Sequence, residues 1–250
     1  MKLAHLLPVL TAGVLLSGWA ALASRYPPVL LPSPHEVLQA SISGAPILAE
    51  ATATTAVASL IGMLIAVGFG LLGAMLFSRS KWLEAALYPY ALLLQTVPIV
   101  AIAPLLVVWL GYGLPPAVAS AAIVSFFPVL TAANLGIRST PTEQVELFAL
   151  YRAGFLSTLF HLRLPSALPF LFSGLRTAAG LSVIGAIVGE FVGSNGFPPS
   201  LGFVVLRSAR SADTATSFAA IFAAAVLALV FFSAVRLLEK LSIGRWHGGE

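Results

Sequence analysis

Long uncharged apolar runs constrain this chain more than any other feature. Only 9% of its 250 residues are Lys, Arg, Asp or Glu, whereas a soluble domain carries about 25% charged residues. The charges sit in clusters, and the intervals between them reach about 20 residues, the length of helix that crosses a ~30 Å hydrocarbon core. With 59% hydrophobic residues and a mean hydropathy of +0.99, the sequence predicts an all-α integral membrane protein.

The apolar runs predict about six transmembrane helices within one domain, residues 1–250. Their predicted bounds are 5–24, 51–77, 86–110, 115–136, 168–192 and 217–237. The first run could instead be a secretory signal, since Lys2 precedes it and Ala21-Leu22-Ala23 has the small-x-small form of a cleavage site. We favour retention because the run is long enough to span, and six helices place both termini on one side.

Basic residues predict the orientation, because Lys and Arg favour the cytoplasmic side. With the N-terminus inside, ten of the thirteen lie inside or at the inner boundary. These are Lys2, Arg79, Lys81, Arg138, Arg152, Arg163, Arg176, Arg236, Lys240 and Arg245. We therefore expect both termini and segment 139–165 in the cytoplasm. The net charge of +4 indicates contact with anionic lipid. It does not indicate binding of nucleic acid, since no basic run is interleaved with aromatic residues.

No motif predicts catalysis, a metal site or a bound cofactor. The chain has no Cys, and His35-Glu36 begins like a zinc-protease motif but is followed by Gln39 where the second His is needed. No glycine-rich phosphate loop precedes any lysine, so this chain does not bind ATP by that route. If it moves a solute uphill, it must take energy from a partner or from an ion gradient.

Glycine and proline patterns predict how individual helices pack and bend. Three glycines at four-residue spacing in the fifth span predict a smooth face for close helix contact; they are Gly185, Gly189 and Gly193. Three prolines in the third span predict one bent helix; they are Pro89, Pro98 and Pro104. Outside the membrane, Ser33 followed by Glu36 predicts a capping box and a short amphipathic helix.

A sparse set of polar side chains at membrane depth is the candidate lining of a translocation path, since such groups pair or line a wet path. The set is Gln95, Thr96, Ser125, Thr131, Asn134 and Glu190. For the Ser and Thr hydroxyls, a bond back to their own helix is the more common arrangement. A helix cannot satisfy the polar groups of Gln95, Asn134 or Glu190 with its own backbone. For these three residues, pairing within the protein and lining of a wet path both stay open.

Segment 139–165 is the one long polar stretch between two spans. Thr140-Pro141-Thr142-Glu143 predicts a helix start with Thr140 as N-cap. The helix is expected to run to about Arg152, where Gly154 can end it, and a second short helix is expected from Phe155 to Pro165. Apolar residues cover too much of its circumference to face water. We expect it to lie on the inner leaflet, under the bundle, or in a groove of a partner.

These motifs resemble the binding-protein-dependent ABC importer permeases over nearly the whole chain. Glu146 lies nineteen residues before Pro165 in the sequence Leu162-Arg163-Leu164-Pro165, the spacing of that family's cytoplasmic loop signature. Other matching segments are Leu31–Leu38, Gln95–Gly113, Phe126–Pro128 and Leu164–Arg176. Together they are similar to the nitrate, sulfonate and taurine branch, which also includes permeases for thiamine-precursor pyrimidines and riboflavin.

The resemblance implies a type I ABC importer permease-like bundle in the bacterial inner membrane. It further implies a homodimer of this chain, two ABC ATPase subunits that bind the ATP, and an external solute-binding protein. The implied ATPase-coupling residues are Glu146, Arg152, Gly154, Leu162, Leu164 and Pro165. Glu146 would be a polar anchor at the ATPase groove, Arg152 an ion-pair donor, and the last three residues a hinge into the fifth span.

The chain departs from the family signature at the coupling loop. Leu147 and Phe148 stand where the family has alanines, and Arg152 stands where it has glycine. We expect these larger side chains to change the geometry with which this loop docks on an ATPase, compared with the family.

Two other classes of function stay open from the sequence. A membrane enzyme would need a catalytic constellation, and the sequence contains none that we recognise. A gradient-driven secondary carrier would need an ion or proton site at mid-depth, for which Glu190 is the one acidic candidate in a span. The transported solute is not fixed by the sequence, and small organic anions and small heterocycles both remain candidates.

Overall fold

The computed structural model describes residues 2–243, with side chains from residue 7 onward. Arg245 and the side chain of Lys2, both used to predict orientation, lie outside the described residues. Within this range every regular element is a helix and no strand occurs. The predicted all-α class is therefore confirmed.

Apolar helices occupy all six predicted runs. Four are long and apolar enough to cross a membrane: α3 (Ala45–Arg79), α6 (Leu114–Arg138), the continuous helix Phe155–Gly193 and α11 (Thr214–Ile243). The pair α4 (Lys81–Thr96) and α5 (Ile99–Leu110) supplies a fifth span if it is taken as one broken helix. Helix α1 (Lys2–Ala23) contains the shorter apolar stretch Leu7–Ala23. The structure thus gives four or five spans by length and composition.

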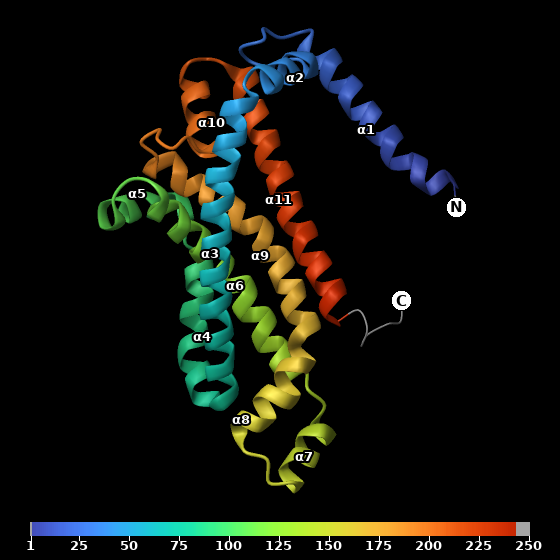
Figure 1. Ribbon diagram of the computed structural model, residues 1–250, viewed down its shortest axis with the longest axis vertical. Coiled ribbons are helices and arrows are strands. Elements are labelled where there is room, and N and C mark those ends of the chain that lie inside the picture. The colour runs from blue at the N-terminus through green and yellow to red at the C-terminus, as the bar shows by residue number, and fades with distance from the viewer. Residues whose placement is uncertain (1, 244–250) are drawn as a thin grey trace.

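Helix α1 touches the bundle only near its C-terminal end. Its Trp19 ring lies 6.0 Å from the ring of Phe218 and 5.8 Å from that of Phe222, and the indole Nε1 donates to the carbonyl of Pro32 at 3.0 Å. Towards its N-terminus the helix diverges from the other helices (Figure 1). Apart from Trp19, the apolar side chains between Leu7 and Leu22 are therefore exposed.

Helices α6 and α9 (Leu164–Gly193) approach closely because glycine removes the side chain between them. A Cβ added at Gly185 would lie 2.8 Å from the Cα of Ala121, and one at Gly189 would lie 2.6 Å from the Cα of Ala117. Two carbon atoms in proteins pack at about 3.5–4.0 Å, so an added methyl group does not fit without movement. The structure places Gly193 against the first turn of α6 in the same way.

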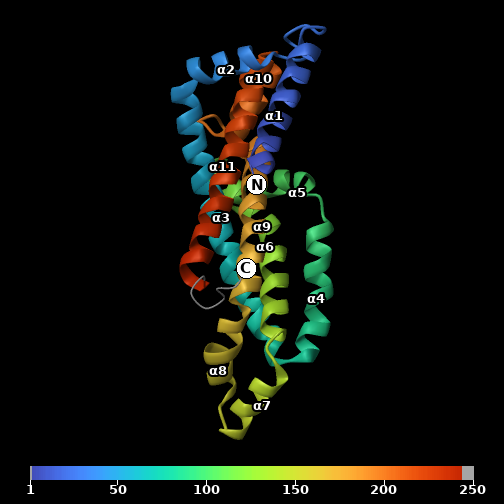
Figure 2. The ribbon, with the colours of Figure 1, turned by 90° about the vertical axis from the view of Figure 1, so that its right-hand side faces the viewer.

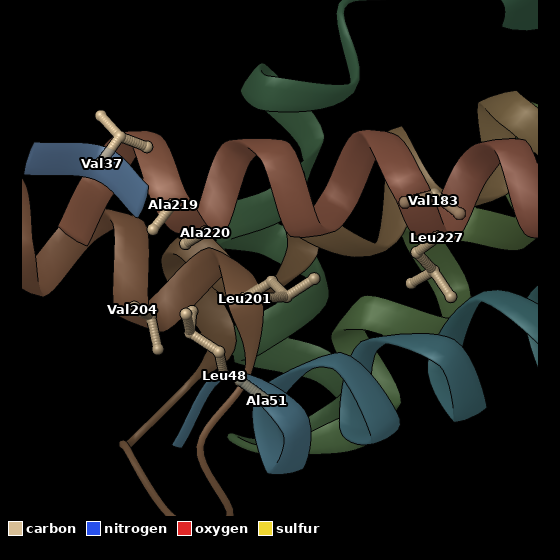
Figure 3. Close-up of a cluster of buried hydrophobic side chains, with 9 residues drawn as sticks. All are labelled: Val37, Leu48, Ala51, Val183, Leu201, Val204, Ala219, Ala220 and Leu227. Carbon is tan, nitrogen blue, oxygen red and sulfur yellow. The ribbon is translucent and has the colours of Figure 1, made fainter. Parts of the chain in front are cut away.

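The largest apolar core joins five helices toward the end of the bundle that carries α10 (Leu201–Arg210), and its nine buried side chains are drawn in Figure 3. Its buried members come from α2 (Pro34–Ser43), α3, α9, α10 and α11. They are Val37, Leu48, Ala51, Val183, Leu201, Val204, Ala219, Ala220 and Leu227. A second core of α3, α4, α6 and α9 side chains, including Phe77, Leu130 and Ile137, lies toward the other end. We call the end of the bundle with the first core the α10 end, and the end with the second core the α7 end.

The predicted capping box at the start of α2 is confirmed. The Ser33 hydroxyl accepts from the Glu36 amide at 3.3 Å, and Glu36 Oε2 accepts from the Ser33 amide at 2.7 Å. These hydrogen bonds, first from the Ser33 backbone and then from its hydroxyl, lower the pKa of Glu36. The box fixes α2 across the α10 end of the bundle (Figures 1 and 2).

The bend predicted within 86–110 is present, but the helix does not continue through it, because the chain breaks there into α4 and α5 with an angle of 98° between them. The break falls at Val97, whose ψ of 124° is extended. The ring of Pro98 disfavours the helical conformation for the residue before it, so α4 must end at this point. Pro89 and Pro104 stay inside their helices, and α5 lies across the long axis of the bundle (Figure 1).

Candidate functional site

Helix α7 (Thr142–Leu150) begins later than the sequence predicts. Pro141 is the N-cap and no side chain caps the first turn. The Thr140 hydroxyl instead donates to the carbonyl of Ile137 at 3.1 Å, so the prediction of Thr140 as N-cap is wrong. Thr140 thus bonds to the last turn of α6, and the helix entry is set by the fixed φ of Pro141.

No residue of α7 is buried. The exposed fractions are 50% for Leu147, 81% for Leu150 and 81% for the adjacent Tyr151, and Glu146 is exposed as well. Both views show α7 at the tip of the molecule, beyond the ends of the long helices (Figures 1 and 2). An exposed cluster of large apolar side chains at a tip is typical of a surface that meets another protein.

The end of α7 has a backbone geometry that favours glycine. Arg152 has a φ of +53°, in the left-handed region. Its amide donates to Ala149 at 2.9 Å, and the amide of Ala153 donates to Phe148 at 2.9 Å, which is the hydrogen-bond pattern of a Schellman C-cap. Glycine adopts this conformation freely and arginine does not. The expectation that Gly154 ends the helix is wrong, since Gly154 is the N-cap of the next helix.

The second predicted short helix does not end at Pro165. Helix α8 (Phe155–Thr158) continues through a π-helical turn, η1 (Leu159–Arg163), into α9. Pro165 has no amide hydrogen to bond the carbonyl four residues earlier, and its ring crowds that carbonyl. The turn widens there, and the amide of Leu164 donates to Leu159 instead. The part of the loop from Phe155 onward and the fifth span thus form one helix of 39 residues. Within it, Leu162 is buried, and Leu164 and Pro165 are partly buried.

Two charged contacts fasten the helix ends near this loop. The Arg79 guanidinium at the end of α3 lies 5.0 Å from the centroid of the Phe155 ring. At the end of α6, Arg138 pairs with Glu84 of α4, and Asn134 Nδ2 donates to the same carboxylate at 3.0 Å. Glu84 is not among the residues predicted from the sequence, because it lies just before the predicted start of the third span. Asn134 therefore has its partner on α4.

The α4–α5 break lines a cavity of about 360 Å³. Gln95 and Thr96 lie on its wall with Pro98, facing Phe127 of α6 and Leu181 of α9. The Thr96 hydroxyl donates to its own helix, at the carbonyl of Leu93 (2.8 Å). Of the six predicted path residues, the structure brings only these two to this cavity.

The remaining hydroxyls of the predicted path are used between or within helices. Ser125 donates to the carbonyl of Ala178 at 3.2 Å and so joins α6 to α9. Thr131 donates to the carbonyl of Phe127 within its own helix at 2.6 Å. Thr131, like Thr96, thus shows the backbone bond within one helix that is common for hydroxyls at membrane depth.

Glu190 is buried at the start of α10, far along the bundle from α7. Its Oε2 accepts from the amide of Gly202 at 2.8 Å and from the hydroxyl of Thr55 at 3.0 Å. That hydroxyl in turn accepts from the amide of Leu201 at 3.0 Å. A carboxylate at a helix N-terminus satisfies amides that have no partner inside the helix. Thr55 and Glu190 therefore attach α10 to α3 and α9.

Sequence reasoning missed α10 and its contact with Thr55. The local signal was present, because Ser200 caps α10 by accepting from the amide of Phe203. The partner Thr55 lies 135 residues before Glu190, so no local pattern reveals the pair. The described residues contain no cluster of His, Cys, Asp or Glu able to hold a metal.

Comparison with known proteins agrees with this geometry. Residues 66–242 match the family described as the binding-protein-dependent transport system inner membrane component. A probable ABC transporter permease protein of Haemophilus influenzae is 36% identical over 243 residues, covering 96% of this chain and 98% of that protein.

Two further relatives are named for the solute of their transport systems. The formylaminopyrimidine transport permease protein ThiX of Halalkalibacterium halodurans is 35% identical, over 86% of this chain and 85% of its own length. The riboflavin transport system permease protein RibX of Chloroflexus aurantiacus is 36% identical, over 94% of this chain and 85% of its own length. The chain therefore belongs to the family of inner membrane components of binding-protein-dependent transport systems, the permeases of ABC-type import systems for small solutes.

Proposed function

We propose that this chain is the membrane subunit of an ATP-driven importer and moves a small solute inward by alternating access. The observation that carries the proposal is the exposed helix α7, joined through α8 and η1 to the full length of α9. A push on α7 would pass along one continuous helix into the bundle as rigid-body motion. ATP would be bound by two separate ATPase subunits, because this sequence has no phosphate loop of its own.

Charge supports a cytoplasmic location for the α7 end. Arg79, Lys81, Arg138 and Arg163 lie at helix ends there, whereas Arg207 and Arg210 lie on α10 at the other end. Since basic residues favour the cytoplasmic side, both termini would be cytoplasmic and α10 would face the solute-binding protein. This orientation places α7 where an ATPase can reach it.

Within the coupling loop, the geometry supports a division of roles. Leu147, Leu150 and Tyr151 would form the apolar contact with the ATPase, and Glu146 would be the polar anchor beside it. Arg152 and Gly154 would set the turn between α7 and α8, with the Arg152 guanidinium available for an ion pair. Leu162, Leu164 and Pro165 would form the hinge, at the π-helical turn, which is a common form of local adjustment at functional sites.

The α4–α5 break is the proposed start of the translocation path. Gln95 and Thr96 line its cavity, and a broken helix at membrane depth is tolerated where it lines a cavity or is covered by protein. A second copy of this chain, packed against the exposed side of α4 and α5, would complete the path as a homodimer. Ser125, Thr131, Asn134 and Glu190 would support the surrounding helices rather than contact the solute.

A small heterocycle is the solute class that we propose first, because relatives named for formylaminopyrimidine and riboflavin transport align with most of this chain. A sulfonate-, nitrate- or taurine-like anion is the second candidate, from the branch that the sequence resembles. The external binding protein would select between them.

The proposal is tested by uptake in cells that carry the chain with its ATPase and binding-protein partners. Deleting the ATPase should abolish uptake, because the chain has no other proposed energy source. Uptake that persists without the ATPase but falls in Glu190→Gln would overturn the proposal and favour the gradient-driven carrier.

A further inference from the structure

A basic cavity lies at the α7 end, separate from the α4–α5 break and from the exposed face of α7. Its volume is about 320 Å³, and it is lined by the ends of α3, α6 and η1, the start of α4 and one residue of α7. Three cationic side chains line it, Lys81, Arg138 and Arg163, together with the hydroxyls of Ser78 and Thr140. No Asp or Glu belongs to its lining.

The positive charge of this cavity is only partly neutralised. Arg138 pairs with Glu84, and Asn134 also donates to that carboxylate. Lys81 and Arg163 make no ion pair with any side chain of residues 7–243. Two full positive charges therefore remain. The Ser78 and Thr140 hydroxyls donate to the carbonyls of Met75 and Ile137, so the Lys81 ammonium and the Arg163 guanidinium are the donors left for a phosphate group.

The position and the apolar wall of the cavity restrict the source of that phosphate. Arg138 ends α6 and Lys81 begins α4, so the cavity sits at the boundary between the membrane and water. Phe77, Ile137 and Val145 also line it, and these side chains offer nothing to a free anion. Basic pockets between helix ends on the cytoplasmic side bind the headgroups of anionic lipids.

We propose that this cavity binds the phosphate of an anionic phospholipid of the inner leaflet, with its glycerol and upper acyl chain against Phe77 and Val145. The inner-leaflet assignment rests on the orientation given under the proposed function. The bound lipid would bridge the α3–α4 turn and η1, the turn at which the proposed hinge lies. Its phosphate would be held by the Lys81 ammonium and the Arg163 guanidinium.

Native mass spectrometry of the purified, delipidated full chain tests this directly. The chain is titrated with phosphatidylglycerol or with phosphatidylcholine of the same acyl chains, and bound lipid is counted. We expect tighter binding of phosphatidylglycerol, and a loss of about fivefold in its affinity for each cation removed in Lys81→Ala and Arg163→Ala. Lys81→Arg should retain binding.

The matched control is the pair Arg236→Ala and Lys240→Ala, which removes two exposed cations toward the same end of α11. This pair should leave phosphatidylglycerol binding unchanged. Because Lys81 is exposed and Arg163 only partly buried, the cavity variants should elute and melt as the parent chain does. If they do not, the test rests on the surface variant Lys81→Gln alone, for which we expect a loss of about fivefold in phosphatidylglycerol affinity.

Three results would overturn the proposal: equal binding of the two lipids, full retention of phosphatidylglycerol in the cavity variants, or its displacement by millimolar inorganic phosphate. The last would show a site for a free anion. The measurement uses no ATPase and no solute. A negative result would therefore leave the proposed transport function standing, and a failure of ATPase coupling would leave lipid binding intact.

Discussion

Arg152 occupies a position at the end of α7 where the backbone favours glycine. Its left-handed backbone, with φ at +53°, disfavours any side chain with a Cβ by roughly 1–2 kcal/mol. The hydrogen bonds from Arg152 to Ala149 and from Ala153 to Phe148 nevertheless keep the turn in place. An arginine here therefore destabilises the turn locally while placing a cation next to the proposed ATPase contact.

We predict that Arg152→Gly stabilises this turn by about 1 kcal/mol, because relief of backbone strain outweighs the extra freedom of glycine in the unfolded chain. Hydrogen exchange at the amide of Ala153 should slow accordingly. Arg152→Ala is the control, since it removes the charge and keeps the strain. If alanine slows exchange as much as glycine does, the side-chain charge and not the backbone is responsible.

Glu190 gives a second test at the level of one residue. Glu190→Ala would leave the buried amide of Gly202 and the hydroxyl of Thr55 without their acceptor, at about 1–3 kcal/mol for each lost partner. We expect faster exchange and faster proteolysis across α10, residues 201–210. Thr55→Val should produce the same local loosening because it frees the amide of Leu201. Unchanged protection of α10 in both variants would contradict the proposed attachment.

At the level of elements, α9 contains a matched pair of glycines. We predict that Gly189→Ala destabilises the chain by about 1–3 kcal/mol, because the methyl group would meet the backbone of α6. Gly180→Ala should stabilise it by up to about 1 kcal/mol, because alanine is the better helix former and nothing lies within 4 Å of the added Cβ. Thermal unfolding in detergent measures both. Shifts of the same sign would contradict the packing of α9 on α6.

The sequence predicts those elements that depend on local pattern. Uncharged runs locate the helices, and the Ser33–Glu36 box locates the start of α2 because both partners lie within four residues. Pro98 marks a bend, but the 98° angle depends on how α5 packs against α6 and α9. The attachment of α10 could not be predicted, since Thr55 and Glu190 meet only when α3 and α9 pack together.

The coupling loop divides in the same way. Glu146 and Pro165 identify the loop by their spacing, but the left-handed turn at Arg152 and the π-helical turn before Pro165 need a backbone to be seen. The sequence therefore supports a separate second helix ending at Pro165, whereas the structure has one helix that reaches Gly193. This difference strengthens the mechanical connection between α7 and the bundle.

At the scale of the whole molecule, the proposed coupling depends on one mechanical connection, which runs from α7 through α9 to α10. Helix α7 stands outside the bundle, and α9 packs along α6, contacts α11 and supports α10 at the opposite end (Figures 1 and 2). Motion at α7 would thus reach the α10 end, where the solute-binding protein would dock. Among the described residues, no other long helix that joins the two ends of the bundle is continued by an exposed helix at the tip.

The most direct measurement is ATP hydrolysis, stimulated by the loaded binding protein, in proteoliposomes that contain the chain with its ATPase partner. Glu146→Lys should reduce the stimulated rate at least tenfold, since it reverses the charge of the proposed anchor on α7. Gln144→Lys, on the opposite face of α7, should leave the rate near that of the parent chain. A stimulated rate in Glu146→Lys equal to that of the parent would contradict coupling through this helix.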